Sequence, residues 1–237
     1  ALHSSSLRLQ KEVETRKESD KRAQFYENYD NLTELPNFKF FKEKLQSEIE
    51  KAAARGQTFA LMCIGLDNFK KINQLYGTEN GHTLLRMISL RLKKSFRDDD
   101  FTSRYLGDKF LILFSDIKFN YNIADLIRKT RSVFQSPFEV GDAEVKLTAS
   151  AGICSYPNDS TQSDELIDKA ELAMYRAKNQ GKNIYQLFDL TMQEDLDRKI
   201  LIEKELTHAI SRNEFYVVYQ PKVNLKGRTI GAEALLR

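Results

Sequence analysis

The side chains best placed for chemistry lie at the tip of an expected β-hairpin. An alternating run, Phe101–Tyr105, leads into the turn Leu106-Gly107-Asp108-Lys109, after which Phe110–Phe114 has the pattern of an apolar strand. A glycine followed by an aspartate between two such runs is typical of a tight hairpin, because glycine readily adopts a positive φ. The tip therefore carries one carboxylate, from Asp108, and one ammonium, from Lys109.

A second set of polar residues follows directly after a strand. The run Thr58–Leu66 is continuously apolar and of strand length, which indicates a strand that is covered on both faces. It leads into the polar segment Asp67–Gly77, which contains Lys70. Proteins that combine helices and strands often bind phosphate groups where a strand ends in such a segment. We therefore expect an anion-binding site near the end of this strand.

The elements that must position these groups follow from the spacing of apolar residues. Asn37 is suited to cap a helix that begins at Phe38 and ends at Arg55-Gly56. Together with the strands above, the pattern predicts an α/β (α+β) fold in which helices flank a central, mostly antiparallel sheet. The other expected elements are the helices Gly81–Lys94, Ile123–Phe134 and Asp164–Gln180 and the strand Val145–Tyr156.

Length and composition limit the class of protein. The 237 residues suit one domain of about 150 residues and a further segment. A net charge of only +3 does not favour nucleic acid as a partner. Cys63 and Cys154 lie inside apolar runs and are expected to be buried free thiols, a disulfide or a reactive thiol being the alternative. No run approaches the roughly 20 apolar residues that span a bilayer, so we expect a cytoplasmic module, whose parent could still be membrane-associated.

Five motifs, in one order over residues 30–188, resemble the GGDEF domain of diguanylate cyclases. The turn corresponds to the signature itself, and A-x-x-A-M-Y-x-A-K lies near the end. The resemblance implies the nucleotidyl-cyclase palm fold, which is related to ferredoxin-like polymerase palms. The motifs lie in Asp30–Asn37, Asp67–Gly77, Leu106–Phe110, Val145–Tyr156 and Ala170–Lys182.

The resemblance also implies a reaction and the residues that take part in it. Two GGDEF domains, each holding one GTP, join the nucleotides into cyclic di-GMP with Mg²⁺ or Mn²⁺ as cofactor. The two metal carboxylates of the family fall on Gly65 and Asp108, and the position of the presumed base falls on Lys109. Glycine offers only its carbonyl, and an ammonium accepts no proton. The backbone of Leu66 and the side chain of Asp67 remain as further metal-ligand candidates.

Nucleotide recognition is assigned through the same motifs. His82 stands where the family has an aspartate that reads guanine, so we expect a relaxed base preference; the alternative is a solvated histidine near a helix start. The lysines would hold phosphates of GTP or of another nucleoside triphosphate, or they are ordinary surface residues. The expected nucleotide-binding residues are Phe69, Lys70, Asn73, His82, Lys178 and Lys182.

A further motif lies just before the hairpin. Arg97 and Asp100 form an R-x-x-D sequence, five residues before the turn begins at Leu106. In the GGDEF family an arginine and an aspartate at this spacing bind cyclic di-GMP as an inhibitory product, and the arginine fork suits phosphate and guanine edges. The alternative is a charged helix end followed by an acidic loop.

Residues 1–29 differ in character from the domain that follows. Ser4–Asn28 is a charged helical pattern with a thin apolar stripe. Such a helix buries little surface by itself. We expect a linker that pairs with the same helix of a second chain to form a homodimer, a solvated single helix being the alternative.

Residues 189–237 begin with an expected connecting helix and end with two expected strands. This segment resembles the opening of an EAL phosphodiesterase domain, because it contains the sequence F-x-x-x-Y-Q-P followed by G-A-E-A-L-L-R. The resemblance implies a metal-binding role for Glu233 and substrate contacts for Gln220 and Arg237. Two strands cannot close a barrel, so this segment alone is not expected to hydrolyse a substrate. The parent is expected to be a GGDEF–EAL tandem protein.

Three functions are compatible with these residues. The first is a GGDEF domain without cyclase activity that binds nucleotide or relays a signal to the EAL domain of the same chain. The second is a cyclic di-GMP receptor that acts through Arg97 and Asp100. The third is a weak diguanylate cyclase, against which Gly65 and Lys109 argue.

Overall fold

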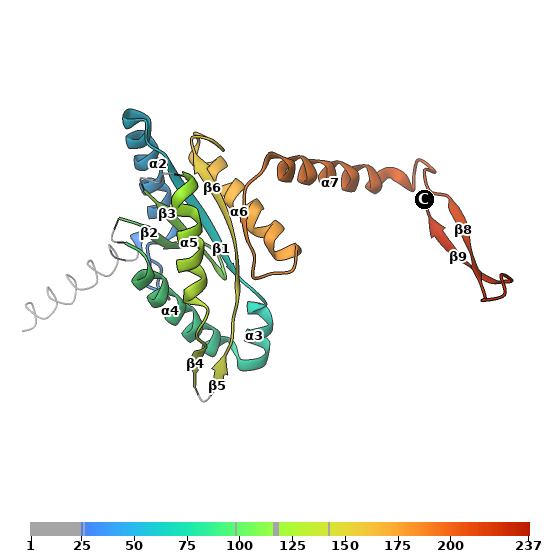
Figure 1. Cartoon of the computed structure of the whole chain (residues 1–237), viewed down its shortest axis with the longest axis horizontal. Helices are drawn as coiled ribbons and strands as arrows, with labels where there is room; N and C mark the ends of the chain where they lie inside the picture. The colour runs from blue at the N-terminus through green and yellow to red at the C-terminus, as the bar shows by residue number, and fades with distance from the viewer. Residues whose placement is uncertain (1–24, 26, 98, 116–118, 142) are drawn as a thin grey trace, which may run out of the picture. The chain divides into compact units, whose positions relative to one another are not determined.

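The computed structural model describes residues 25, 27–97, 99–115, 119–141 and 143–237, and the chain divides into two compact units between Asp189 and Leu190 (Figure 1). The linker helix expected over Ser4–Asn28 lies almost entirely outside the described residues, so its pairing with a second chain stays a prediction. Among the described residues, no helix is both long and apolar enough to cross a membrane.

A five-stranded sheet forms the centre of the first unit. Its strand order is β2-β3-β1-β6-β7, in which β6 and β7 are parallel and all other neighbours are antiparallel. This arrangement confirms the mostly antiparallel sheet and the α/β fold class that the sequence predicts. The strands are β1 (Phe59–Leu66), β2 (Phe101–Arg104), β3 (Lys109–Phe114), β6 (Ala149–Tyr156) and β7 (Tyr185–Leu187).

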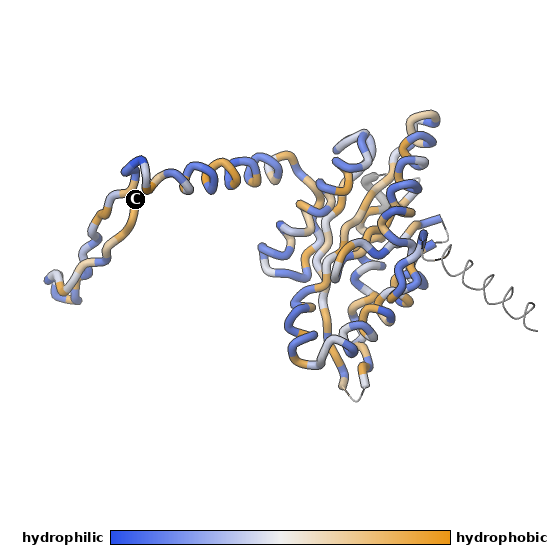
Figure 2. The backbone as a smooth tube through the Cα atoms, turned by 180° about the vertical axis from the view of Figure 1, so that it is seen from behind, coloured by the Kyte–Doolittle hydropathy of each residue, from blue (hydrophilic) through white to orange (hydrophobic). Residues whose placement is uncertain are grey.

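Helices cover both faces of this sheet, which explains why β1 is apolar along its whole length. Ala60, Met62 and Ile64 of β1 pack in one core with α4 (Thr78–Ser95) and α5 (Phe119–Val133). Alternate β1 residues pack in a second core with α2 (Phe38–Arg55) and α6 (Ser163–Asn179). In Figure 2 the central strands are coloured mainly as hydrophobic, whereas the helices alternate between hydrophobic and hydrophilic residues.

The structure corrects one predicted strand. The run Val145–Tyr156 is expected to be continuous, but Lys146–Thr148 lies outside any strand. The segment before it forms a small hairpin, made of β4 (Phe138–Val140) and β5 (Ala143–Val145), and β6 begins only at Ala149. The interruption lies where Thr148 bonds to Asp67, since the backbone N–H of Asp67 donates to the Thr148 carbonyl at 2.9 Å. At this point, the hydrogen bond between Asp67 and Thr148 therefore takes the place of regular strand pairing.

Both cysteines are buried and free, as the sequence predicts. Burial raises the pKa of the Cys63 thiol to about 12 and that of Cys154 well above its ordinary value. Such thiols stay protonated at neutral pH, and they act as small apolar groups in the core.

The second unit consists of a helix followed by a hairpin. Helix α7 spans Leu190–Ala209, and the strands β8 (Val217–Val223) and β9 (Thr229–Leu236) pair in antiparallel fashion. Gln220 and Glu233 lie directly opposite each other in this hairpin. The helix and the two strands expected after residue 189 are therefore present, with boundaries shifted by a few residues.

Candidate functional site

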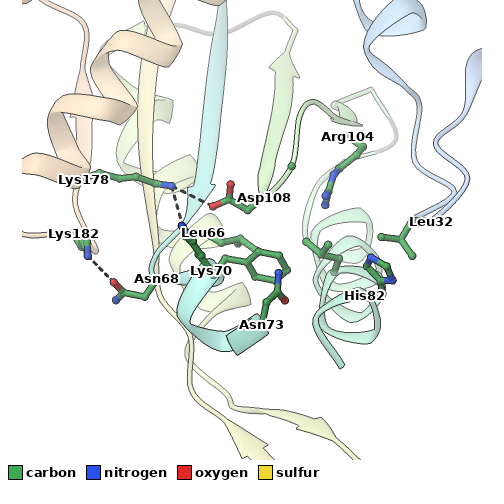
Figure 3. A pocket seen from close by; sticks show the side chains of 13 residues that line it. Leu32, Leu66, Asn68, Lys70, Asn73, His82, Arg104, Asp108, Lys178 and Lys182 are labelled. Atoms are coloured by element: carbon green, nitrogen blue, oxygen red, sulfur yellow. Dashed lines mark hydrogen bonds and ion pairs between the residues drawn. The ribbon is translucent and has the colours of Figure 1, made fainter. Parts of the chain in front are cut away.

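A pocket of about 570 Å³ lies at the end of β1, beside the β2–β3 turn and the short helix α3 (Phe69–Tyr76) (Figure 3). It brings together predicted residues from four separate parts of the chain. The predicted residues that line it are Leu66, Phe69, Lys70, Asn73, His82, Asp108, Lys178 and Lys182. The lining also contains Leu32, Asn68, Leu85, Arg104 and Gly107.

Backbone hydrogen bonds hold the β2–β3 turn against the end of β1. The Lys109 N–H donates to the Leu106 carbonyl at 2.9 Å, and Gly107 adopts a φ of 57°. The Leu66 N–H donates to the Asp108 carbonyl at 3.1 Å. The backbone of Asp108 is therefore fixed beside Leu66, where the sequence motif expects a metal ligand.

The ammonium of Lys178, from α6, lies between these two residues. Its Nζ is 3.0 Å from the Leu66 carbonyl oxygen and 3.3 Å from Asp108 Oδ2 (Figure 3). Gly65 provides the space for this side chain, since a Cβ at that position would lie 2.7 Å from Cε and Nζ of Lys178. The end of the Lys178 side chain thus occupies the space that the missing Cβ of Gly65 leaves.

Asp67 has a structural position that the sequence did not reveal. Its side chain is only 2% exposed and accepts hydrogen bonds from Thr148 Oγ1 at 2.7 Å, Ser150 Oγ at 2.8 Å and the Asn183 N–H at 2.9 Å. Asp67 is not among the residues that line the pocket. Its carboxylate connects β6 to the turn that carries Lys182, whose Nζ donates to Asn68 Oδ1 at 2.6 Å.

Lys109 also points away from the pocket lining. Its ammonium forms an ion pair with Glu171 of α6, and the Tyr105 hydroxyl donates to the other oxygen of Glu171 at 3.1 Å. Burial by itself lowers the pKa of Lys109, but the hydrogen bond and charge of Glu171 outweigh it and leave this pKa above its ordinary value. The ammonium therefore keeps its proton and cannot accept another.

The opposite end of the pocket holds polar atoms without partners. Asn73 Oδ1 is buried and has no hydrogen-bond partner among the described residues. Gly81 allows α4 to approach it, since a Cβ there would lie 1.9 Å from Asn73 Oδ1. His82 is 40% exposed, and its Nδ1 lies 3.8 Å from Glu79. The arrangement leaves an acceptor and an imidazole available to a ligand.

Arg104 is a lining residue that the sequence analysis missed. Its side chain is only 8% exposed, and its Nη1 has no hydrogen-bond partner among the described residues. The guanidinium lies over the Phe110 ring at 5.0 Å from the centroid. Burial lowers its pKa from the ordinary value, while the charges of Asp30 and Asp108 act in the opposite direction. The signal available in the sequence was a charged residue at the end of an alternating hairpin strand, directly before the turn.

Comparison with known proteins decides the family. The family model described as "Diguanylate cyclase, GGDEF domain" matches residues 27–184 of this chain. The chain belongs to the GGDEF domain family. This confirms the resemblance that the motifs indicate, and it places the domain in cyclic di-GMP signalling.

Curated relatives of this GGDEF protein are much longer than the chain. It is 35% identical over 210 residues to the bifunctional diguanylate cyclase/cyclic di-GMP phosphodiesterase MucR of Pseudomonas aeruginosa, a match that covers 88% of this chain and 30% of MucR. It is 32% identical over 210 residues to the cyclic di-GMP phosphodiesterase NbdA of the same organism, covering 88% of this chain and 27% of NbdA. The chain thus spans less than a third of these relatives.

The fold also matches a solved GGDEF domain. The structure of TpbB (YfiN) from Pseudomonas aeruginosa, comprising only the GGDEF domain, shares 29% identity with a TM-score of 0.69. The match covers 71% of this chain and 99% of that chain. The predicted cyclase fold is therefore confirmed.

The R-x-x-D residues of the GGDEF domain line a second pocket. It has a volume of about 530 Å³ and contains Arg97 and Asp100 together with basic residues of α2, namely Lys44, Lys51 and Arg55. The backbone N–H of Arg97 donates to Asp100 Oδ2 at 3.0 Å. Burial raises the pKa of Asp100 above its ordinary value, against the effect of this hydrogen bond. The predicted pair is therefore brought together beside α2 residues that are mostly basic but include Glu48.

The first pocket does not fit the two divalent ions that the cyclase resemblance implies. Among the described residues that line it, Asp108 alone carries a carboxylate, and that carboxylate already contacts Lys178. Gly65 supplies no side chain, and the carboxylate of Asp67 is occupied by three donors. Mg²⁺ needs oxygen ligands in near-octahedral geometry, and the described residues offer few that are free of other partners.

Proposed function

We propose that residues 30–188 form a nucleotide-binding GGDEF module that does not synthesise cyclic di-GMP and that relays its state to an EAL domain. The ion pair between Lys109 and Glu171 carries the proposal. At the position where the family has its general base, this chain has an ammonium that Glu171 of α6 holds in place. Loss of a general base costs about 10²- to 10⁴-fold in rate, and Gly65 removes a metal carboxylate as well.

The charge of the first pocket supports nucleotide binding. In the part of the lining that the structure describes, the cations of Lys70, Lys178, Lys182 and Arg104 outnumber the one carboxylate, that of Asp108. A surplus of cations suits the phosphates of GTP or of another nucleoside triphosphate. The unpartnered atoms of Asn73 and Arg104 are suited to hydrogen-bond such a ligand, because buried polar atoms without partners are rare in folded proteins.

The hypothesis that the module relays a signal rests on the segments that flank it. We propose a linker over residues 1–29 that joins two chains, and the start of an EAL domain over residues 189–237. The division of the chain into two compact units between Asp189 and Leu190 supports the second boundary. The position of Glu233 opposite Gln220, and the names of the longer relatives, support an EAL continuation.

The decisive experiment measures synthesis and binding in the same preparation. The protein is incubated with GTP and Mg²⁺ or Mn²⁺, and the products are separated by chromatography. GTP binding to the same preparation is followed by calorimetry, both with and without the metal ion. We expect GTP to bind without formation of cyclic di-GMP. Turnover comparable with that of an intact cyclase would refute the loss of activity, and the absence of any binding would leave the domain as a spacer or a dimerisation unit.

The relay is tested in the complete parent protein. Hydrolysis of cyclic di-GMP is compared with and without GTP, in the wild type and in the Lys70→Ala variant. A nucleotide can shift a conformational equilibrium only by its difference in affinity for the two states. We therefore expect GTP to change the rate in the wild type and not in the variant. An equal response in both would refute the relay.

The second pocket supports one further candidate function, a cyclic di-GMP receptor. The described part of its lining combines four cations, from Arg97, Lys44, Lys51 and Arg55, with the carboxylates of Glu48, Asp99 and Asp100. The cations are suited to phosphates, and the carboxylates can accept hydrogen bonds from guanine edges. If this function holds, Arg97→Ala abolishes the binding of cyclic di-GMP in calorimetry, whereas Lys70→Ala in the other pocket leaves it intact.

A further inference from the structure

The ammonium of Lys178 occupies a place that suits a metal ion. It contacts the Leu66 carbonyl oxygen at 3.0 Å and Asp108 Oδ2 at 3.3 Å. A backbone carbonyl and a carboxylate are oxygen ligands of the kind that divalent cations bind. A lysine head is a compact cation with three N–H donors, so two donors serve these oxygens and one remains for a ligand.

Gly65 makes this arrangement possible. A Cβ at position 65 would lie 2.7 Å from Lys178 Cε, from Lys178 Nζ and from Met174 Sδ. Any residue other than glycine at this position therefore requires the ends of Lys178 and Met174 to shift from the places they hold here. The inward position of Lys178 thus depends on the glycine at position 65, where the family has a carboxylate.

The rest of the pocket fits a ligand that retains its full negative charge. Lys70, Lys182 and Arg104 add three more cations to the lining. Lys182 is held in place by its hydrogen bond to Asn68, and the Arg104 side chain is nine-tenths buried with an unpartnered Nη1. A nucleoside triphosphate without a metal carries more negative charge than its Mg²⁺ complex, and these cations can balance it.

We propose that Lys178 takes the place of a divalent cation, so that this pocket binds the free nucleoside triphosphate rather than its Mg²⁺ complex. This inference rests on the proposed nucleotide-binding function. It adds that binding requires no metal ion.

Calorimetric titration of the whole chain with GTP, in excess EDTA and in excess Mg²⁺, tests this inference. We expect GTP to bind in EDTA at least as tightly as in Mg²⁺. Binding that requires Mg²⁺ would overturn the inference and leave the nucleotide-binding function intact. Absence of binding in both buffers would overturn both.

Two variants test the role of Lys178 itself. Lys178→Met should weaken binding in EDTA by about tenfold or more, because a charge-assisted contact is lost. It should also make binding stronger in Mg²⁺ than in EDTA, since Leu66 and Asp108 are then open to the ion. Gly65→Ala should act in the same direction, because its Cβ meets only the flexible ends of Lys178 and Met174.

Lys182→Met is the matched control. It removes one positive charge from the same lining but leaves the contacts of Lys178 unchanged, so it should weaken binding by a similar factor in both buffers. Thermal unfolding shows that each variant is folded. Wild-type affinity of folded Lys178→Met in EDTA would overturn the inference.

Discussion

Lys109, at the end of the β2–β3 turn, forms an ion pair with Glu171 on α6, whose other carboxylate oxygen accepts the Tyr105 hydroxyl at 3.1 Å. The two side chains of the pair are 25% and 28% exposed. The turn is therefore tied to α6 by charge on one side, while Asp108 contacts Lys178 of the same helix on the other. In this protein, two ion pairs of the β2–β3 turn connect the central sheet to α6; together they are called the turn clamp below.

Reversing the charge at position 109 should weaken the turn clamp. Lys109→Glu places two carboxylates side by side, and we expect a loss of about 1 kcal/mol or more in the free energy of unfolding. Urea unfolding measures it. The double variant Lys109→Glu with Glu171→Lys should recover much of the loss, since it restores an ion pair. Simple additivity of the two single changes would show that the residues do not interact.

Base selectivity should depend on residue 82. A carboxylate accepts hydrogen bonds from both N1–H and N2–H₂ of guanine, whereas a neutral imidazole accepts one and an imidazolium none. We expect the wild type to distinguish GTP from ATP weakly, and His82→Asp to raise the preference for GTP by about tenfold. Calorimetry with both nucleotides at several pH values measures this. His208→Asp, on α7, is the control, and strong GTP selectivity of the wild type at every pH would refute the role of His82.

Removing the Asp67 carboxylate should reveal whether that residue is structural. Asp67→Ala leaves three donors without their buried acceptor, and an unsatisfied buried group costs about 1–3 kcal/mol. We expect a large fall in unfolding free energy, and a smaller fall for Asp67→Asn, which retains one oxygen. Glu79→Gln, at an exposed site, is the control. A normal melting temperature of Asp67→Ala combined with altered metal dependence would instead support a metal ligand.

The sequence predicted where the pocket lies but not how its charges pair. The apolar run of β1, the hairpin turn and the α6 motif each depend on local patterns, so their positions near one another follow once the fold is recognised. Asp67 lies two residues beyond Gly65, yet its carboxylate bonds to Thr148 and Ser150 of a distant segment. Alternation along a strand predicts on which face of the sheet a side chain lies, but it does not predict which residues that side chain bonds to.

Arg104 is a second residue whose position the sequence did not predict. In the sequence it is one polar residue in an alternating hairpin strand, and only the fold reveals that it is buried at the pocket wall. The position of Lys178 was likewise hidden, because the motif gives it a phosphate role and says nothing of the room left by Gly65. Long side chains reach sites that are set by tertiary packing.

Alkaline pH should destabilise the domain through Tyr185. Burial raises the pKa of this phenol to about 12 from an ordinary value of 10.0, despite the opposing charge of Arg131. The unfolded chain therefore loses this proton at a lower pH than the native state, so stability falls as pH rises from about 10 to about 12. Cys63, whose pKa is also raised, acts in the same direction. Tyr185→Phe should flatten this decline in urea unfolding relative to the wild type, and an identical slope would contradict it.

Cyclase activity should return only when its missing groups are restored together with their surroundings. Lys109→Glu supplies a carboxylate at the base position, but Glu171 repels it unless Glu171→Lys is added. Gly65→Asp supplies the second metal carboxylate and pushes Lys178 away from Leu66, since its Cβ lies 2.7 Å from the lysine end.

We expect the triple variant, which combines Gly65→Asp, Lys109→Glu and Glu171→Lys, to form cyclic di-GMP from GTP in the presence of Mg²⁺. The single variants should remain inactive, because residues that act as a unit do not contribute additively. Chromatography of the products measures the outcome, and the wild type with the Lys109–Glu171 pair is the reference. A folded triple variant that binds GTP but makes no product would show that the loss of activity lies elsewhere in the domain.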